Sequence, residues 1–253
     1  MSTPLDYRPD FSATEWSVAW ARVLARLTEA QREVLAATWT LPTPEEFAEV
    51  SQEGPAQWLS EGGNPSLQAM WSLALRELLP AELPTVTVEQ REWREPRIVA
   101  ANVILTQPTQ WIAPVVFLGS VRAAHPLLDR GPDSCVTVVG ALSAPGLFTS
   151  GDMQLLGDVD VPFIEGSGSN NMLLVLGDVR SQVIFEEGHA SSWAGQVEAR
   201  VHATFAELPA TQEQKLEEAL LPEFLSESRP YLGLATQAAA EGRVVLRAPP
   251  EGE

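Results

Sequence analysis

The chain has 253 residues and a formal net charge of −18, from 34 acidic and 16 basic side chains. This length can bury a substantial core, and the acidic balance argues against nucleic acid or an anionic membrane as partner and favours a basic one. No apolar run approaches the roughly 20 residues of a membrane span, and the N-terminus lacks the basic and apolar regions of a signal peptide. We therefore expect a cytoplasmic protein.

Residues 1–83 predict a small N-terminal helical domain. Helix-start signals, in which a capping side chain is followed by acidic or apolar residues at helical spacing, occur at four places. The capping residues are Ser12, Thr28, Thr43 and Asn64. Proline follows directly after Thr43 and Asn64, as is common at the first helical position. The helix that restarts at Thr28 is expected to continue to Leu41.

Residues 84–206 predict a right-handed parallel β-helix. An apolar phrase containing a glycine recurs through this segment, with spacings of 21, 17 and 20 residues between the glycines. The glycines are Gly119, Gly140, Gly157 and Gly177. A repeat of this length suits a solenoid coil that buries its face by stacking on the next coil, and crossover chirality makes the right hand the default. The turn-rich stretches 129–133 and 165–171 are expected to be corners and outer loops.

Residues 207–253 predict a C-terminal helical cap and a short strand. A helix is expected from Thr211 to about Phe224, and a second at 232–240, before a strand at 242–246. The predicted fold class is therefore mainly β with flanking helices, in three parts.

The phrases at 155–159 and 173–179, with the tail at 221–225 and 241–246, resemble bacterial bactofilin-like β-helix proteins. The resemblance is closer to the β-helix proteins of this kind that are encoded near polymorphic toxin systems, and it covers about half the chain. It implies a β-helix strongly and a function weakly. Bactofilins polymerise through bare coil ends. Helical segments covering both end coils here would block such growth, so we expect a monomer or small oligomer.

Four aspartates form a candidate acidic row for binding a partner. Asp158 and Asp178 hold the same place in successive phrases, so they are expected to stack about 4.8 Å apart. Such a pair could hold a metal or act as a glycosidase-like pair. The preferred interpretation is structural: the glycine takes an unusual φ at a coil corner and the aspartate bonds backbone amides. Asp152 and Asp160 extend the acidic character.

No catalytic set accompanies these residues. His125, His189 and His202 lack metal-ligand spacing, and Cys135 reads as a small core residue. We therefore expect no metal, no cofactor and no enzymatic activity. The leading hypothesis is an immunity protein that binds and neutralises a basic toxin, with no nucleic-acid or membrane partner. The alternatives are a bactofilin-like scaffolding polymer and, least supported, an enzyme that uses the β-helix groove.

Overall fold

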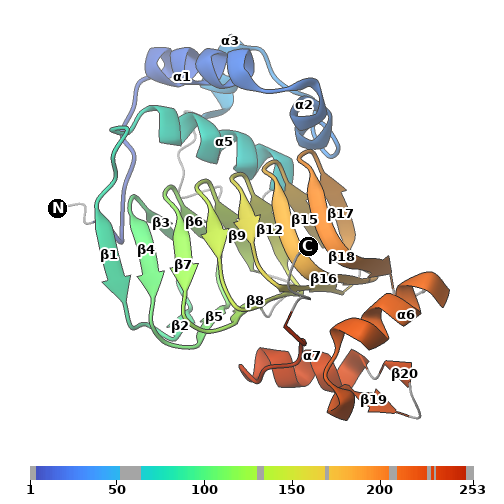
Figure 1. The fold of residues 1–253 in the computed structure, drawn as a ribbon. Helices are drawn as coiled ribbons and strands as arrows, with labels where there is room; N and C mark the ends of the chain where they lie inside the picture. Colours follow the sequence, from blue (N-terminus) through green and yellow to red (C-terminus); the bar gives the residue numbers. More distant parts are fainter. Residues whose placement is uncertain are drawn as a thin grey trace.

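The structure is a computed structural model and shows a parallel β-solenoid with helices along its sides (Figure 1). Each full turn contributes one strand to each of three faces, and the strands of successive coils pair in parallel. This confirms the predicted fold class. The described residues are 4–51, 64–129, 134–168, 171–204, 210–226, 229–230 and 232–248.

The three faces are named here by their strands. Face A contains β1 (Thr85–Val88), β4 (Asn102–Leu105), β7 (Val121–Ala123), β10 (Leu142–Ser143), β13 (Val159–Asp160) and the first halves of β16 (Val179–Glu187) and β18 (Val197–Thr204). Face B contains β2 (Glu92–Trp93), β5 (Thr109–Trp111), β8 (Leu127–Asp129), β11 (Leu147–Thr149), β14 (Phe163–Ser167) and the second halves of β16 and β18. Face C contains β3 (Arg97–Val99), β6 (Val115–Phe117), β9 (Cys135–Val138), β12 (Asp152–Leu155), β15 (Met172–Val175) and β17 (Ala190–Trp193).

The flanking elements follow the capping signals closely. They are α1 (Ala13–Arg26), α2 (Glu29–Leu35), α3 (Pro44–Ser51), α5 (Pro65–Glu77), α6 (Ala210–Ala219), the 3-10 helix η1 (Pro222–Phe224), β19 (Leu225–Ser226), β20 (Arg229–Pro230) and α7 (Leu232–Ala240). Full capping boxes at Ser12 and Thr28 begin α1 and α2. At the start of α5 the Asn64 side chain accepts hydrogen bonds from two backbone amides.

Three of the predicted boundaries were wrong. The helix that starts at Thr28 ends at Leu35 rather than Leu41, and α6 ends at Ala219. The predicted strand at 242–246 contributes one antiparallel bridge, between Leu246 and Leu220. In each case apolar residues continue past the end of the element, and an apolar pattern alone does not mark where the backbone hydrogen bonding stops.

The glycines of the repeat stack where face C turns into face A, and their role differs from the predicted one. They do not have a positive φ. A Cβ at Gly177 would instead lie 2.3 Å from the backbone of Gly157, and one at Gly157 would lie 2.6 Å from the backbone of Gly140. Glycine is required because successive coils approach too closely for any side chain.

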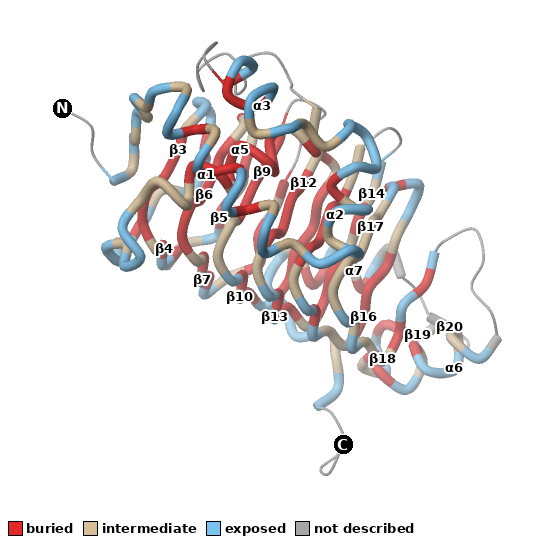
Figure 2. The backbone as a smooth tube through the Cα atoms, turned by 90° about the horizontal axis from the view of Figure 1, so that it is seen from above, coloured by how far each residue is buried: buried red, intermediate tan, exposed pale blue. Residues whose placement is uncertain are grey.

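The interior of the solenoid is filled by one side of every strand. Val, Leu and Ile side chains from all three faces form a continuous buried cluster, closed near the first coils by Trp93, Trp111 and Phe117. Figure 2 shows the strands largely buried and the outer sides of the helices exposed.

Face C is apolar on its outer side as well, because the N-terminal helices cover it. Ile98, Val116 and Leu174 point outward and pack with Trp71 of α5 in a second buried cluster. A polar contact also fastens the helix: the Gln68 amide nitrogen donates to the Thr137 hydroxyl at 3.1 Å. The helices therefore lie along the side of the solenoid (Figure 1).

The outer side of face B is covered in its later coils by the C-terminal segment. Phe163, Val183 and Val201 pack against Leu216 and other apolar residues of α6, η1 and α7 in a third cluster. In the described part of the chain no helix packs on the outer side of face A, where polar and charged residues such as Arg122, Ser143 and Asp160 point outward.

The helices pack mainly on two faces of the solenoid, and α6 also lies beside β18 of the last coil. At the first coil, the edge of β3 is bonded by the N-terminal segment: the Tyr7 amide donates to Ile98 and the Ala100 amide donates to Pro4, both at 2.8 Å. At the last coil, β17 and β18 have no strand partner on their outer edges within the described ranges. The solenoid is thus covered mainly on its sides.

Candidate functional site

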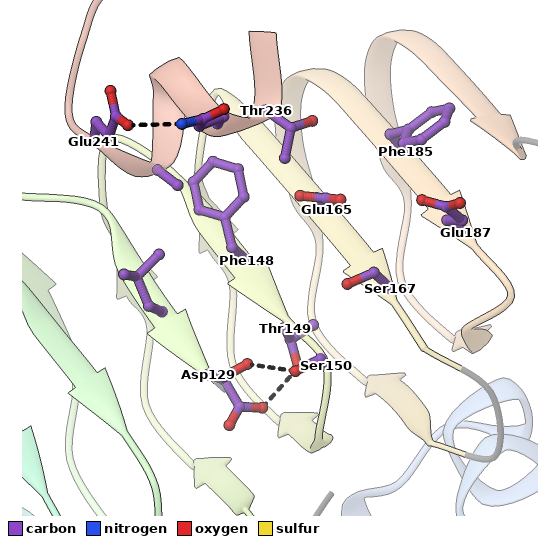
Figure 3. Close-up of a pocket in the computed structure, with 13 residues that line it drawn as sticks. Asp129, Phe148, Thr149, Ser150, Glu165, Ser167, Phe185, Glu187, Thr236 and Glu241 are labelled. Atoms are coloured by element: carbon purple, nitrogen blue, oxygen red, sulfur yellow. Dashed lines mark hydrogen bonds between the residues drawn. The ribbon is translucent and has the colours of Figure 1, made fainter. Parts of the chain in front are cut away.

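A pocket of about 960 Å3 lies where α7 passes over face B. Its floor is built from β8, β11, β14 and β16, and its roof from the end of α7. The lining residues are Leu128, Asp129, Phe148, Thr149, Ser150, Glu165, Ser167, Phe185, Glu187, Thr236, Gln237, Ala240 and Glu241. Figure 3 shows Phe148 and Glu165 on the strands and Thr236 on the helix that passes over them.

The strand register explains how Glu165 enters this pocket. Phe148, Glu165 and Phe185 are Cα partners on β11, β14 and β16, so they form one outward-facing row across adjacent strands. Apolar residues suit this row because the C-terminal segment packs on it. Glu165 interrupts it with a carboxylate between two phenyl side chains.

Burial raises the pKa of Glu165 to about 7, and repulsion from Glu187 makes a smaller contribution to this rise. The Glu165 carboxyl group has no hydrogen-bond or ion-pair partner among the residues that the structure describes. A carboxylate in such surroundings is stabilised either by taking up a proton or by pairing with a cation.

Asp129, at the end of β8, is a second acidic residue of the lining, but its side chain lies on the inward side of the strand, opposite the outward-facing Leu128. Only 1% of the residue is exposed. Its Oδ2 accepts a hydrogen bond of 2.7 Å from the Thr149 hydroxyl, whereas its Oδ1 is buried without a partner in the described part of the chain. Burial raises the pKa of Asp129 to about 6, although bonds from Ser134, Thr149 and the Gly151 amide lower it.

The charge of the pocket is one-sided. Four acidic residues line it, and no lysine, arginine or histidine is among the lining residues that the structure describes. Glu241 is partly neutralised, because it accepts a bond of 3.1 Å from Gln237 and lies 3.5 Å from Arg243. The pocket is therefore suited to a positively charged group with some apolar surface.

The four aspartates singled out in the sequence occupy different places. Asp158 and Asp178 do stack in successive coils at the glycine corner, as predicted. Asp158 Oδ1 accepts from the Asp178 amide at 3.1 Å, and Asp178 Oδ1 accepts from the Gln196 amide at 2.9 Å. Asn102 makes the same bond to the Ser120 amide. We call this exposed position the corner ladder, because side-chain oxygens of one coil accept hydrogen bonds from backbone amides of the next coil.

Asp160 lies nearby on face A, and Asp152 lies elsewhere. Asp160 is exposed and sits in register with Arg180 on β16, which pairs with Glu198 at 3.6 Å, so this row carries both charge signs. Asp152 starts β12 on face C and accepts from the Met172 amide at 2.8 Å. Burial raises its pKa. The four residues do not form one continuous acidic row.

The other sequence candidates are mostly structural. Cys135 is buried, and burial raises its pKa to about 12. His189 is buried, with Nε2 3.0 Å from the Gly151 carbonyl oxygen. Among the residues that the structure describes, no three histidine, cysteine, aspartate or glutamate side chains gather as a metal site requires.

The sequence interpretation missed Asp129 and Glu165 as site residues. Both were assigned to turn-rich stretches, and the structure places them at the end of β8 and inside β14. The available signal was their position directly after the apolar runs Leu127–Leu128 and Phe163–Ile164. That signal does not reveal which element covers the strands.

No protein-family model, no curated protein and no solved structure matches this chain. Within the described ranges, no helix combines the length and the apolar character that crossing a bilayer requires. A function for the chain therefore has to be inferred from its own residues.

Proposed function

We propose that the chain is a non-enzymatic interaction protein, specifically an immunity protein that binds and neutralises a basic toxin. The observation that carries this proposal is the pocket on face B, where the described lining residues include four acidic and no basic side chains. A net charge of −18 supports a basic partner, since complementary charge speeds encounter and disfavours acidic competitors.

The architecture supports the same role. Stacked coils with continuous parallel pairing and helices packed along two sides make a preorganised scaffold. Preorganisation lowers the entropy that a binding surface loses when its partner docks. The pocket lies at the junction of two such parts, the solenoid and the C-terminal segment.

Association kinetics with a basic protein encoded beside this chain's gene would test the proposal. The association rate is expected to fall about tenfold or more between low salt and 0.5 M salt, because screening shortens the reach of charge. Glu165→Gln with Glu187→Gln should speed dissociation, whereas Asp158→Asn with Asp178→Asn, at the corner ladder, should leave it nearly unchanged. Absence of binding, or a salt-independent rate, would contradict the proposal.

A second candidate function, a bactofilin-like scaffold, is favoured by one observation. The outer edges of β17 and β18 lack strand partners in the described part of the chain, and an unpaired edge is a template for pairing with another copy. Sedimentation velocity across a range of protein concentrations distinguishes the two. Concentration-dependent growth beyond a small oligomer would support the scaffold, and one small species would support the discrete binding protein.

A further inference from the structure

We infer that the pocket on face B binds an alkylammonium or guanidinium group on an apolar stem, with Glu165 as the carboxylate that pairs with it. The inference rests on the proposed function for the source of that group, a lysine or arginine side chain of the protein partner. The site itself is built entirely from this chain.

The first argument is the unpaired carboxylate inside the pocket. A partly buried carboxylate without a donor costs free energy, and native proteins usually pair such a group. Glu165 has no hydrogen-bond or ion-pair partner in the described part of the chain, and its neighbours in the outward row are Phe148 and Phe185. An N–H donor entering the pocket would satisfy it with a charge-assisted hydrogen bond, which is stronger than a neutral one.

The second argument is the combination of aromatic walls and carboxylates. Phe148 and Phe185 flank Glu165 in register, and Leu128 continues the apolar row. Phenyl faces attract organic cations, and the same walls suit the methylene stem that carries such a group. Glu187, one row further along β16, adds a second negative charge within the lining.

The third argument distinguishes an organic cation from a metal ion. Metal ions such as Ca2+ need several oxygen ligands converging on one point. In the described part of the chain no group of three such side chains converges. An ammonium or guanidinium group has donors pointing in several directions, so it can use carboxylates spread around a cavity of about 960 Å3.

Titration calorimetry on the full chain with simple probes tests the inference. The probes are 1,5-diaminopentane, agmatine and an acetylated, amidated Gly-Lys-Gly peptide, with 1,5-pentanediol as the uncharged match. Saturable binding of the amines and none of the diol is expected at pH 8. Tighter binding of the peptide than of the diamine would assign the site to a protein side chain, and the reverse order would assign it to a free amine.

Variants locate the binding. Glu165→Gln is expected to weaken amine binding roughly tenfold or more, the loss typical of a hydrogen bond to a charged group. Glu187→Gln should act in the same direction, and circular dichroism would show that each variant is folded. Glu82→Gln, which removes an exposed carboxylate before β1, is the matched control and should bind as the unmodified chain does.

Two results would overturn the inference. One is the absence of saturable binding of any amine up to about 10 mM, where even weak binding would be detected. The other is equal binding by the Glu165→Gln variant and the control. The calorimetry needs no toxin, so its failure is distinct from failure of the proposed function. Amine binding without neutralisation would leave the site standing and refute the immunity role.

Discussion

Replacing Glu165 by glutamine should change how the stability of the protein depends on pH. In the folded state burial between Phe148 and Phe185, with Glu187 nearby, raises the pKa of Glu165 to about 7 from an ordinary value of 4.5. The folded protein therefore binds the proton more tightly than the unfolded chain between these two values. The contribution of Glu165 to the free energy of unfolding is therefore fully present below about pH 4.5, and it is lost as the pH rises through 7.

The size of the effect follows from the shift. One pKa unit corresponds to about 1.4 kcal/mol, so a shift from 4.5 to about 7 corresponds to about 3 kcal/mol. Because Glu165 keeps some contact with solvent, about 2 kcal/mol is a more suitable expectation. Glutamine resembles the protonated carboxyl group at every pH. The Glu165→Gln variant should therefore match the unmodified chain at pH 4.5 and be more stable by about 2 kcal/mol at pH 8.5.

Urea denaturation at fixed ionic strength from pH 4.5 to 8.5 measures this difference. General repulsion in a chain of net charge −18 also grows with pH, but it affects both proteins and largely cancels in the comparison. Burial also raises the pKa of Asp129, but this residue is present in both proteins, so its contribution cancels in the comparison as well. The Glu82→Gln variant should show a pH profile parallel to that of the unmodified chain. Parallel profiles for Glu165→Gln and the unmodified chain would refute the burial argument.

Three further predictions concern the scaffold. Gly177→Ala should destabilise the chain by about 1–3 kcal/mol in urea denaturation, because its Cβ would lie 2.3 Å from the backbone of Gly157; an unchanged midpoint would contradict the close approach. Asp178→Ala should cost about 1 kcal/mol by removing the acceptor for the Gln196 amide, and hydrogen exchange should then quicken at Gln196. Burial raises the pKa of the Cys135 thiol to about 12, so a thiol reagent at pH 8 should react only after denaturant is added; rapid native labelling would be inconsistent with the burial.

The repeat and the helix starts were predictable because they depend on local rules. Ser12 with Glu15 and Thr28 with Gln31 satisfy backbone amides within one turn, so the spacing alone is informative. The glycine phrase likewise depends on contacts between identical positions of neighbouring coils. The φ explanation failed because close backbone approach and unusual dihedrals both select glycine, and a sequence does not distinguish them.

The position of the helices along the sides of the solenoid was harder to predict, although the sequence gives one indication of it. Strands of face C such as Val115–Phe117 are apolar without alternation, which is typical of strands buried on both sides. Face A strands such as Val121–Ala123 alternate. Glu165 was missed for a related reason: the residues that enclose it come from α7, about 70 residues further along the chain, and no local pattern connects the two.

The most direct test of the central claim is rescue of growth. Cells that express a basic toxic protein encoded beside this chain's gene are compared with and without co-expression of the chain. We predict that the unmodified chain and Glu82→Gln restore growth, and that Glu165→Gln with Glu187→Gln, purified as a folded protein, restores it poorly. Full rescue by the pocket variant would contradict the pocket as the binding site, and no rescue by the unmodified chain would contradict the immunity role.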